Sequence, residues 1–109
     1  MSVLEKNSID YIYVEDNHII MGISDHLTWQ EEAIVAHWQL LQDKLKNYIG
    51  FIKSGQLFEQ YPDFDKQPCI KIFFPQKCPD VVDKYLNKLK KYYNELQCDL
   101  VWIYDPQED

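Results

Sequence analysis

The chain has 109 residues, of which 46% are hydrophobic and 15% aromatic, and its formal net charge is −7 at pH 7. This length predicts one domain spanning residues 1–109, and this apolar content excludes a disordered chain. No apolar run approaches the roughly 20 residues that a bilayer-spanning helix needs. The start, MSVLEKNS, lacks the basic segment followed by an apolar one that marks a secretory signal. We therefore expect a cytoplasmic domain without a membrane partner.

The charge is unevenly distributed along the chain. Residues 1–65 carry 11 acidic and 4 basic side chains, residues 66–98 carry 3 and 7, and residues 99–109 carry 4 acidic side chains and no basic one. All 11 basic residues are Lys. Because Arg is the usual ligand of guanine edges and phosphates, its absence and the acidic balance argue against a nucleic-acid partner. The acidic balance suits a basic protein partner, or solubility alone.

The N-terminal third predicts a β-hairpin. Residues 8–16, SIDYIYVED, are rich in β-branched and aromatic side chains, and residues 18–24, HIIMGIS, read as the returning strand. Asp16 and Asn17 tolerate positive φ and suit the tight turn between the strands. Tyr11 and Tyr13 share one face of the first strand.

A long helix is predicted over about residues 29–53. Thr28 and Glu31 have the spacing of a capping box. Apolar residues then recur with a helical period, at Ile34, Trp38, Leu41, Leu45, Tyr48, Ile49 and Ile52. Ser54-Gly55 supplies a stop signal, and the connection that follows contains a short helical turn before Pro62.

The remainder predicts a strand at 69–74, a helix at about 79–97 and a strand at 99–104. The order ββαβαβ, with two helical crossovers, favours parallel neighbours. We expect an α+β or α/β two-layer sandwich: a four-stranded mixed sheet with two helices on one face. The opposite face would then be open, unless the loop at 56–68 covers it, and would carry residues such as Phe73, Val101 and Ile103, or their neighbours along the strands.

Asp25 and His26 stand side by side before the long helix and raise the question of an acid–base pair. Adjacent residues at the end of a strand point to opposite sides, so these two side chains do not form a working dyad. Ser24, Asp25 and Thr28 are all good capping residues in front of an apolar periodic run. We therefore interpret Asp25 as part of the helix cap.

The remaining candidates for chemistry are weaker. His37 lies near the apolar stripe of the long helix and is expected to be a packed or edge residue with one satisfied nitrogen. The three His and three Cys show no metal-ligand spacing, and no Gly-rich phosphate loop is present. Cys78, before Pro79 at a helix N-terminus, is the thiol most expected to have a lowered pKa. We expect no catalytic residue, metal or cofactor; a small enzyme using Cys78 or His26 is a minor alternative.

The segments ISDHLTW and LLQDKLKNYIGFIKSGQLFEQYP resemble a family of small bacterial proteins of about this length, known as a domain of unknown function. The likeness covers roughly residues 1–62, and the C-terminal half is similar only in pattern. The resemblance implies no activity that transfers to particular residues. By size, charge and lack of catalytic parts, the chain also resembles toxin-immunity proteins as a class.

These observations favour a non-catalytic protein-binding module. The leading hypothesis is an immunity-type inhibitor that neutralises a basic toxin, such as a nuclease, by stoichiometric binding. The alternative is a homodimeric structural or regulatory domain that pairs through the open sheet face. The predicted partner surface combines acidic side chains with aromatic anchors: Tyr11, Tyr13, Glu15, Asp16, Asp25, Trp29, Glu31, Glu32, Glu59, Asp63, Phe64 and Asp65.

Overall fold

The computed structural model describes residues 11–15, 17–25, 29, 31–61 and 67–104. The strands and the two long helices follow one another in the predicted order ββαβαβ. Their bounds are β1 (Tyr11–Glu15), β2 (His18–Ser24), the 3-10 turn η1 (Glu31–Ala33), α1 (Ile34–Lys53), α2 (Gln56–Gln60), β3 (Gln67–Phe74), α3 (Asp80–Glu95) and β4 (Asp99–Tyr104). The predicted helical turn before Pro62 is α2. Among these described helices, none has the length and apolar character needed to cross a membrane.

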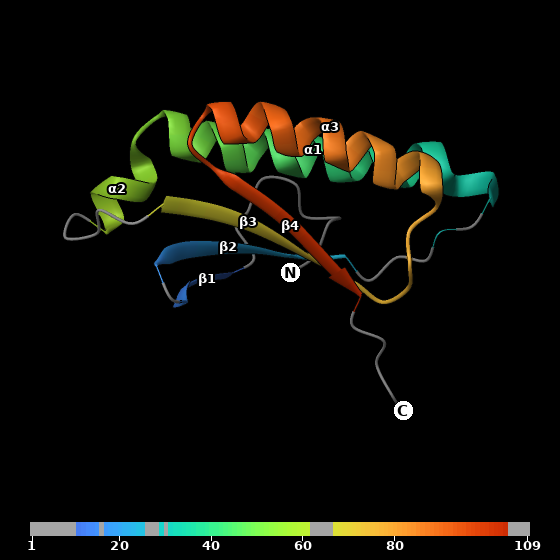
Figure 1. Cartoon of the computed structure of the whole chain (residues 1–109), viewed down its shortest axis with the longest axis horizontal. Helices are drawn as coiled ribbons and strands as arrows, with labels where there is room; N and C mark the ends of the chain where they lie inside the picture. The colour runs from blue at the N-terminus through green and yellow to red at the C-terminus, as the bar shows by residue number, and fades with distance from the viewer. Residues whose placement is uncertain (1–10, 16, 26–28, 30, 62–66, 105–109) are drawn as a thin grey trace.

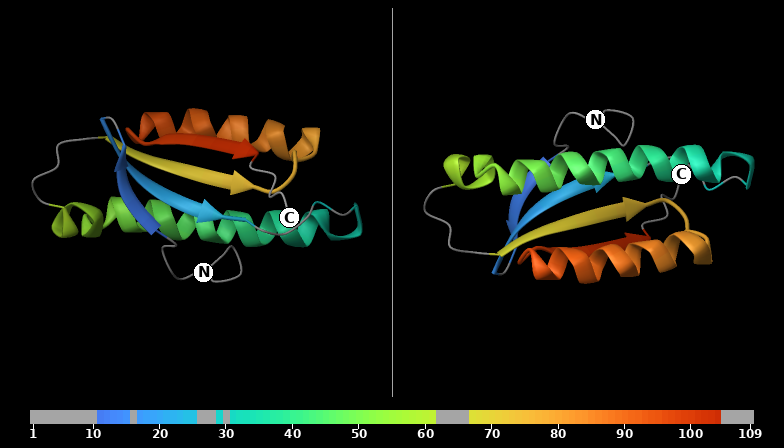
Figure 2. Two further views of the ribbon diagram at one scale, coloured as in Figure 1. Left: turned by 90° about the horizontal axis from the view of Figure 1, so that it is seen from below. Right: turned by 90° about the horizontal axis from the view of Figure 1, so that it is seen from above.

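The four strands form one mixed sheet in the order β1-β2-β3-β4. β1 pairs antiparallel with β2, while β2 with β3 and β3 with β4 pair in parallel. Both long helices, α1 and α3, lie on the same face of this sheet (Figure 1). The predicted two-layer sandwich is therefore confirmed. No described helix or strand lies against the other face, and α2 lies beyond one end of α1 (Figure 2).

The core fills the space between the sheet and the two helices. Alternate residues of β2, Ile19, Met21 and Ile23, are fully buried, as the period of two predicts. They belong to one cluster with apolar residues of β3, β4, α1 and α3, including Ile70, Ile72, Phe74, Leu100, Leu41, Leu45, Tyr48, Val82 and Leu86. Each fully buried aliphatic side chain contributes about 1.5–3 kcal/mol to folding, so this single cluster accounts for the layered architecture.

The start of the long helix differs from the prediction. A 3-10 turn over Glu31–Ala33 precedes α1, and Ala33 occupies the N-cap position with no side-chain cap. The interpretation of Asp25 as a capping residue is wrong, because its carboxylate instead bonds a side chain inside the first turn of α1, at His37. Thr28, and with it the predicted capping box, lies outside the described residues.

The two long helices end in the same way but with different residues. After α1, Gly55 adopts a left-handed φ of 84°, and its N–H bonds the Ile52 carbonyl, so the predicted stop is confirmed. After α3, Gln97 occupies the equivalent position with φ 61°. Its N–H bonds the Asn94 carbonyl, and the Cys98 N–H bonds the Tyr93 carbonyl, which together make a Schellman motif. A residue with a Cβ atom is strained there, by about 1 kcal/mol.

Replacing Gln97 by Gly should therefore stabilise the protein. We expect Gln97→Gly to raise the free energy of unfolding by about 0.5–1 kcal/mol, since Gly adopts positive φ without steric cost. Glu95→Gly, at the exposed last residue of α3, is the matched control. It should lower the free energy of unfolding by a similar amount. Urea denaturation of both variants checks the prediction, and a loss of stability in Gln97→Gly contradicts it.

Candidate functional site

The face of the sheet away from the helices is the largest candidate site, and we call it the outer sheet face. It carries the residues that alternate with the core residues along each strand. Strand register places them in rows across the sheet: Glu15, His18 and Gln67; Tyr13, Ile20, Cys69 and Asp99; Lys71 and Val101; Ser24, Phe73 and Ile103. Most are half-buried or exposed, although Ile20 and Cys69 are buried. Of the two sets of strand residues that the sequence left open for this face, it is Phe73, Val101 and Ile103 that lie on it.

One end of the outer sheet face is polar and internally paired. Asp99, at the start of β4, accepts hydrogen bonds from the His18 Nε2 at 2.8 Å and from the Gln67 Nε2 at 3.0 Å. The Lys71 Nζ lies 3.6 Å from a Glu15 carboxylate oxygen and 5.5 Å from the centre of the Phe73 ring. These pairs bridge all four strands. Because they are partly exposed, each contributes only about 0–1 kcal/mol to stability, so they fix side-chain positions more than they hold the fold.

The opposite end of the outer sheet face is apolar. Phe73 and Val101 are half-buried there, and Ile103 is 39% exposed. A contiguous apolar patch beside ordered polar groups is the composition that protein-binding surfaces share. The outer sheet face is therefore the candidate site with both apolar and ordered polar side chains.

A second candidate lies where β2 meets α1. The His37 imidazole donates from Nε2 to an Asp25 carboxylate oxygen at 2.6 Å, and the two residues are 3% and 1% exposed. The Asp25 N–H also bonds the Phe73 carbonyl, which fixes this residue against β3. The Trp29 ring stacks on the imidazole with ring centres 3.6 Å apart. The predicted packed His37 with one satisfied nitrogen is confirmed, since its Nδ1 has no partner among the described residues.

This Asp–His pair has the composition of an acid–base dyad, but a substrate cannot reach the imidazole. Both side chains are shielded from solvent, and the Trp29 indole covers the ring. A general base has to reach the reacting atom within about 3 Å, directly or through one water. In this conformation the pair instead ties the end of β2 to the first turn of α1.

Removing one partner of the Asp25–His37 pair should lower the stability of the fold. We expect His37→Leu to lower the free energy of unfolding by about 3 kcal/mol, because a buried carboxylate loses its hydrogen-bond donor. The double variant Asp25→Asn/His37→Leu should lose less than the sum of the single variants, since the partners act as a unit. The control is His18→Leu, which breaks the half-exposed pair with Asp99. It should cost under about 1 kcal/mol. Equal losses at both histidines, measured in urea, contradict this assignment.

The three cysteines are buried and unpaired, and the prediction of a lowered pKa at Cys78 is wrong. Burial raises the pKa of the Cys78 thiol, whose sulfur lies 3.7 Å from the Tyr104 hydroxyl oxygen. Burial also raises the pKa of Cys69 to about 11 and that of Cys98 to about 12. The reason is that a thiolate loses its hydration inside the protein, and proximity to a helix N-terminus does not compensate for this at Cys78.

These thiols should destabilise the fold at alkaline pH. Above the ordinary thiol pKa of 9.0 the unfolded chain loses protons that native Cys69 and Cys98 retain. The free energy of unfolding should therefore be unaffected by these groups below pH 9 and fall between pH 9 and about pH 11, by up to about 1.4 kcal/mol per pH unit for each thiol. Cys69→Ala should make the fall shallower. The free energy of unfolding is measured by urea denaturation of both proteins across this pH range. If it falls as steeply with pH in Cys69→Ala as in the wild type, the prediction is contradicted.

The structure disperses the predicted partner surface. Tyr13 and Glu15 lie on the outer sheet face, and Tyr11 lies on β1. The inclusion of Asp25 in an exposed surface is wrong, because its side chain is buried against His37. The remaining described residues lie elsewhere: Trp29 is half-buried against His37, Glu31 and Glu32 are exposed before α1, and Glu59 is exposed on α2. Asp16, Asp63, Phe64 and Asp65 lie outside the described residues.

Sequence reasoning missed the pairing residues of the outer sheet face. His18, Gln67, Lys71 and Asp99 come from three strands, and only the register between strands brings them together. Their one signal in the sequence is the alternation of polar with apolar residues along the strands. The described residues contain no cluster of three or more His, Cys, Asp or Glu that could hold a metal ion.

These features define a class: a small α/β sandwich with one face of the sheet covered by helices and no described helix or strand against the other. The chain belongs to a family of unknown function (DUF6572), whose model matches residues 1–105. The similarity to a family of unknown function, inferred from the N-terminal segments, is thus confirmed and extends into the C-terminal half. No curated protein and no solved structure matches the chain.

Proposed function

We propose that this protein is a non-catalytic protein-binding module of the immunity type, which neutralises a basic toxin by stoichiometric binding. The observation that carries the proposal is the outer sheet face. It combines an apolar patch at Phe73, Val101 and Ile103 with charged groups already held in place by Glu15–Lys71 and His18–Asp99 pairs. Groups that are ordered before binding lose little conformational entropy on association.

Charge supports a basic partner. The chain carries a net charge of −7. Glu15 at the end of β1 and Asp99 at the start of β4 lie at the end of the sheet where β2 and β3 begin, and Glu59 lies on α2 near the same end. An acidic surface raises the association rate with a basic protein and disfavours acidic partners. A nuclease, which itself binds an anionic polymer, is the toxin class whose surface complements this charge.

The described candidates for chemistry fit this non-catalytic proposal. The Asp25–His37 pair is enclosed, and burial raises the pKa values of all three thiols, which disfavours the nucleophilic thiolate. An inhibitor needs only a complementary surface, which a rigid sheet supplies.

The test is capture of a partner by the tagged protein from its native cells, compared across variants. We expect one basic protein in equimolar ratio, and at least about tenfold weaker capture by Ile103→Asp and by Glu15→Lys, since these remove the apolar and acidic parts of the outer sheet face. The matched controls are Val35→Asp, at an 82% exposed position on α1, and Glu95→Lys on α3. Both should capture as wild type.

The captured protein then decides the biological role. Its expression alone should arrest growth, and co-expression of the wild-type chain, but not of Ile103→Asp, should restore it. A captured protein that is harmless, or capture that survives both outer-face variants, contradicts the proposal. If the purified chain alone sediments as a dimer that Ile103→Asp dissociates, a second copy covers this face and the homodimer alternative replaces the inhibitor.

A further inference from the structure

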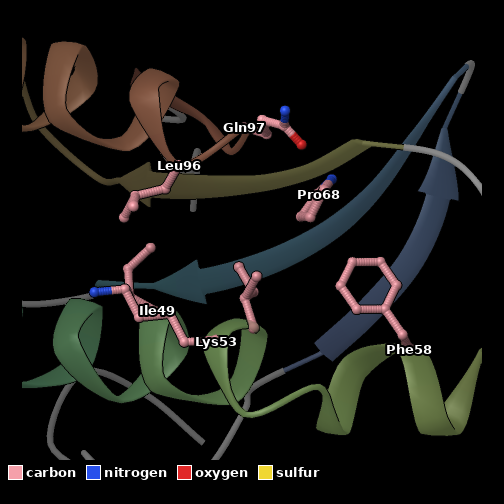
Figure 3. Close-up of a pocket in the computed structure, with 7 residues that line it drawn as sticks. Ile49, Lys53, Phe58, Pro68, Leu96 and Gln97 are labelled. Carbon is pink, nitrogen blue, oxygen red and sulfur yellow. The ribbon is translucent and has the colours of Figure 1, made fainter.

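Two adjoining hollows lie beside α1. One lies between α1 and α3, and the other is lined by residues of α1, α2 and β3 and by the two residues that follow α3. The first has a volume of about 370 Å³ and is lined by Lys46, Ile49, Gly50, Lys53, Leu89, Tyr92 and Tyr93. The second, of about 270 Å³, is lined by Ile49, Ile52, Lys53, Phe58, Pro68, Leu96 and Gln97 (Figure 3). Ile49 and Lys53 border both, so we treat the two hollows as one interhelical groove.

The walls of the interhelical groove are predominantly apolar. Ile49 on α1 and Leu89 and Tyr93 on α3 line the first hollow. In the second, the side chains of Phe58, Pro68 and Leu96 surround a common space (Figure 3). Phe58 remains 39% exposed although it lines an apolar surface. Small-molecule sites are usually concave and mostly apolar with a few polar groups, and their volumes start at about 300 Å³.

Gly50 widens the groove at a position where the fold does not need a glycine. It begins the last turn of the 20-residue helix α1, where Gly costs up to about 0.5–1 kcal/mol relative to Ala. A Cβ atom built at Gly50 would meet no other heavy atom within 4 Å. Neither close packing nor a positive φ therefore explains this residue. Its absent side chain leaves room in the wall of the groove instead.

Among the described residues that line the interhelical groove, the charged ones are two lysines, Lys46 and Lys53. Lys46 and Lys53 are exposed, and neither forms an ion pair with any residue in the described ranges. The Lys53 Nζ lies 5.9 Å from the centre of the Tyr92 ring, which positions its charge beside the groove. None of the residues within the described ranges that line the two hollows is acidic. An apolar groove with two unopposed cations on one rim complements an amphipathic anion.

We propose that the interhelical groove binds a small amphipathic carboxylate with an unbranched apolar chain. The carboxylate lies over Gly50, between Lys46 and Lys53, and the chain extends toward Phe58, Pro68 and Leu96. The carboxylate is assigned to the first hollow because both lysines line it, whereas Lys53 is the one lysine among the residues that line the second. This site is separate from the outer sheet face and does not depend on the proposed function.

The test is calorimetric titration of the full chain with sodium decanoate, and with decanol and decyltrimethylammonium as matched probes. We expect one decanoate bound per chain and at least about tenfold weaker binding of the other two probes, because only decanoate has both the chain and the negative charge. Lys53→Gln should weaken decanoate binding but leave decanol binding unchanged. Equal affinity for all three probes, or no binding of decanoate below its micellar range, overturns the proposal.

Variants that place a side chain at Gly50, and so fill the interhelical groove, give the decisive test. Gly50→Leu should fold with unchanged or higher thermal stability, since Leu favours the helix, and should weaken decanoate binding at least about tenfold. Gly50→Ala should also stabilise the fold and weaken binding less. Ala36→Leu adds the same bulk at an exposed position of α1 outside the groove and should bind decanoate as wild type. Wild-type binding by a folded Gly50→Leu overturns the proposal.

Discussion

The handedness of parallel crossovers constrains this molecule more than any single contact. Two strand–helix–strand connections follow each other, from β2 through α1 to β3 and from β3 through α3 to β4, and each moves one strand further in the same direction across the sheet. Such connections are almost always right-handed, so both helices have to fall on the same face. The hairpin strand β1 adds an edge without adding a helix. One face of the sheet is thereby packed, and no described element lies against the other.

This asymmetry produces two distinct surfaces. On the outer sheet face, residues that alternate with the core are half-exposed and pair across strands, as in the contacts of Asp99 with His18 and Gln67. In the helical layer, α1 and α3 flank a groove in which Gly50 and two lysines face apolar walls. The first surface is the site proposed for a protein partner, and the second is the site proposed for a small anion.

A buried polar contact holds the two layers in register at one end. The hydrogen bond between Asp25 and His37 joins the residue after β2 to the first turn of α1, and the Tyr48 hydroxyl donates to the Gly22 carbonyl further along the same pair of elements. Buried polar groups are costly when unpaired, so such contacts specify one alignment of helix and sheet among the several that apolar packing alone would allow. The dyad-like composition of Asp25 and His37 therefore has a structural explanation.

The sequence by itself determined the elements and their layering, because hydrophobic period, turn residues and the Ser54-Gly55 stop are local signals. Alternation along a strand is local too, and it grouped Val101 with Ile103 on one side of their strand, but it left open whether they or their neighbours face away from the helices. Only the tertiary structure decided that Asp25 bonds His37 rather than capping a helix, that the Cys78 thiol is enclosed, and that Asp99 meets His18 across 81 positions of the chain. Those outcomes depend on strand register and on which side chains lose water, and neither is encoded in any short segment.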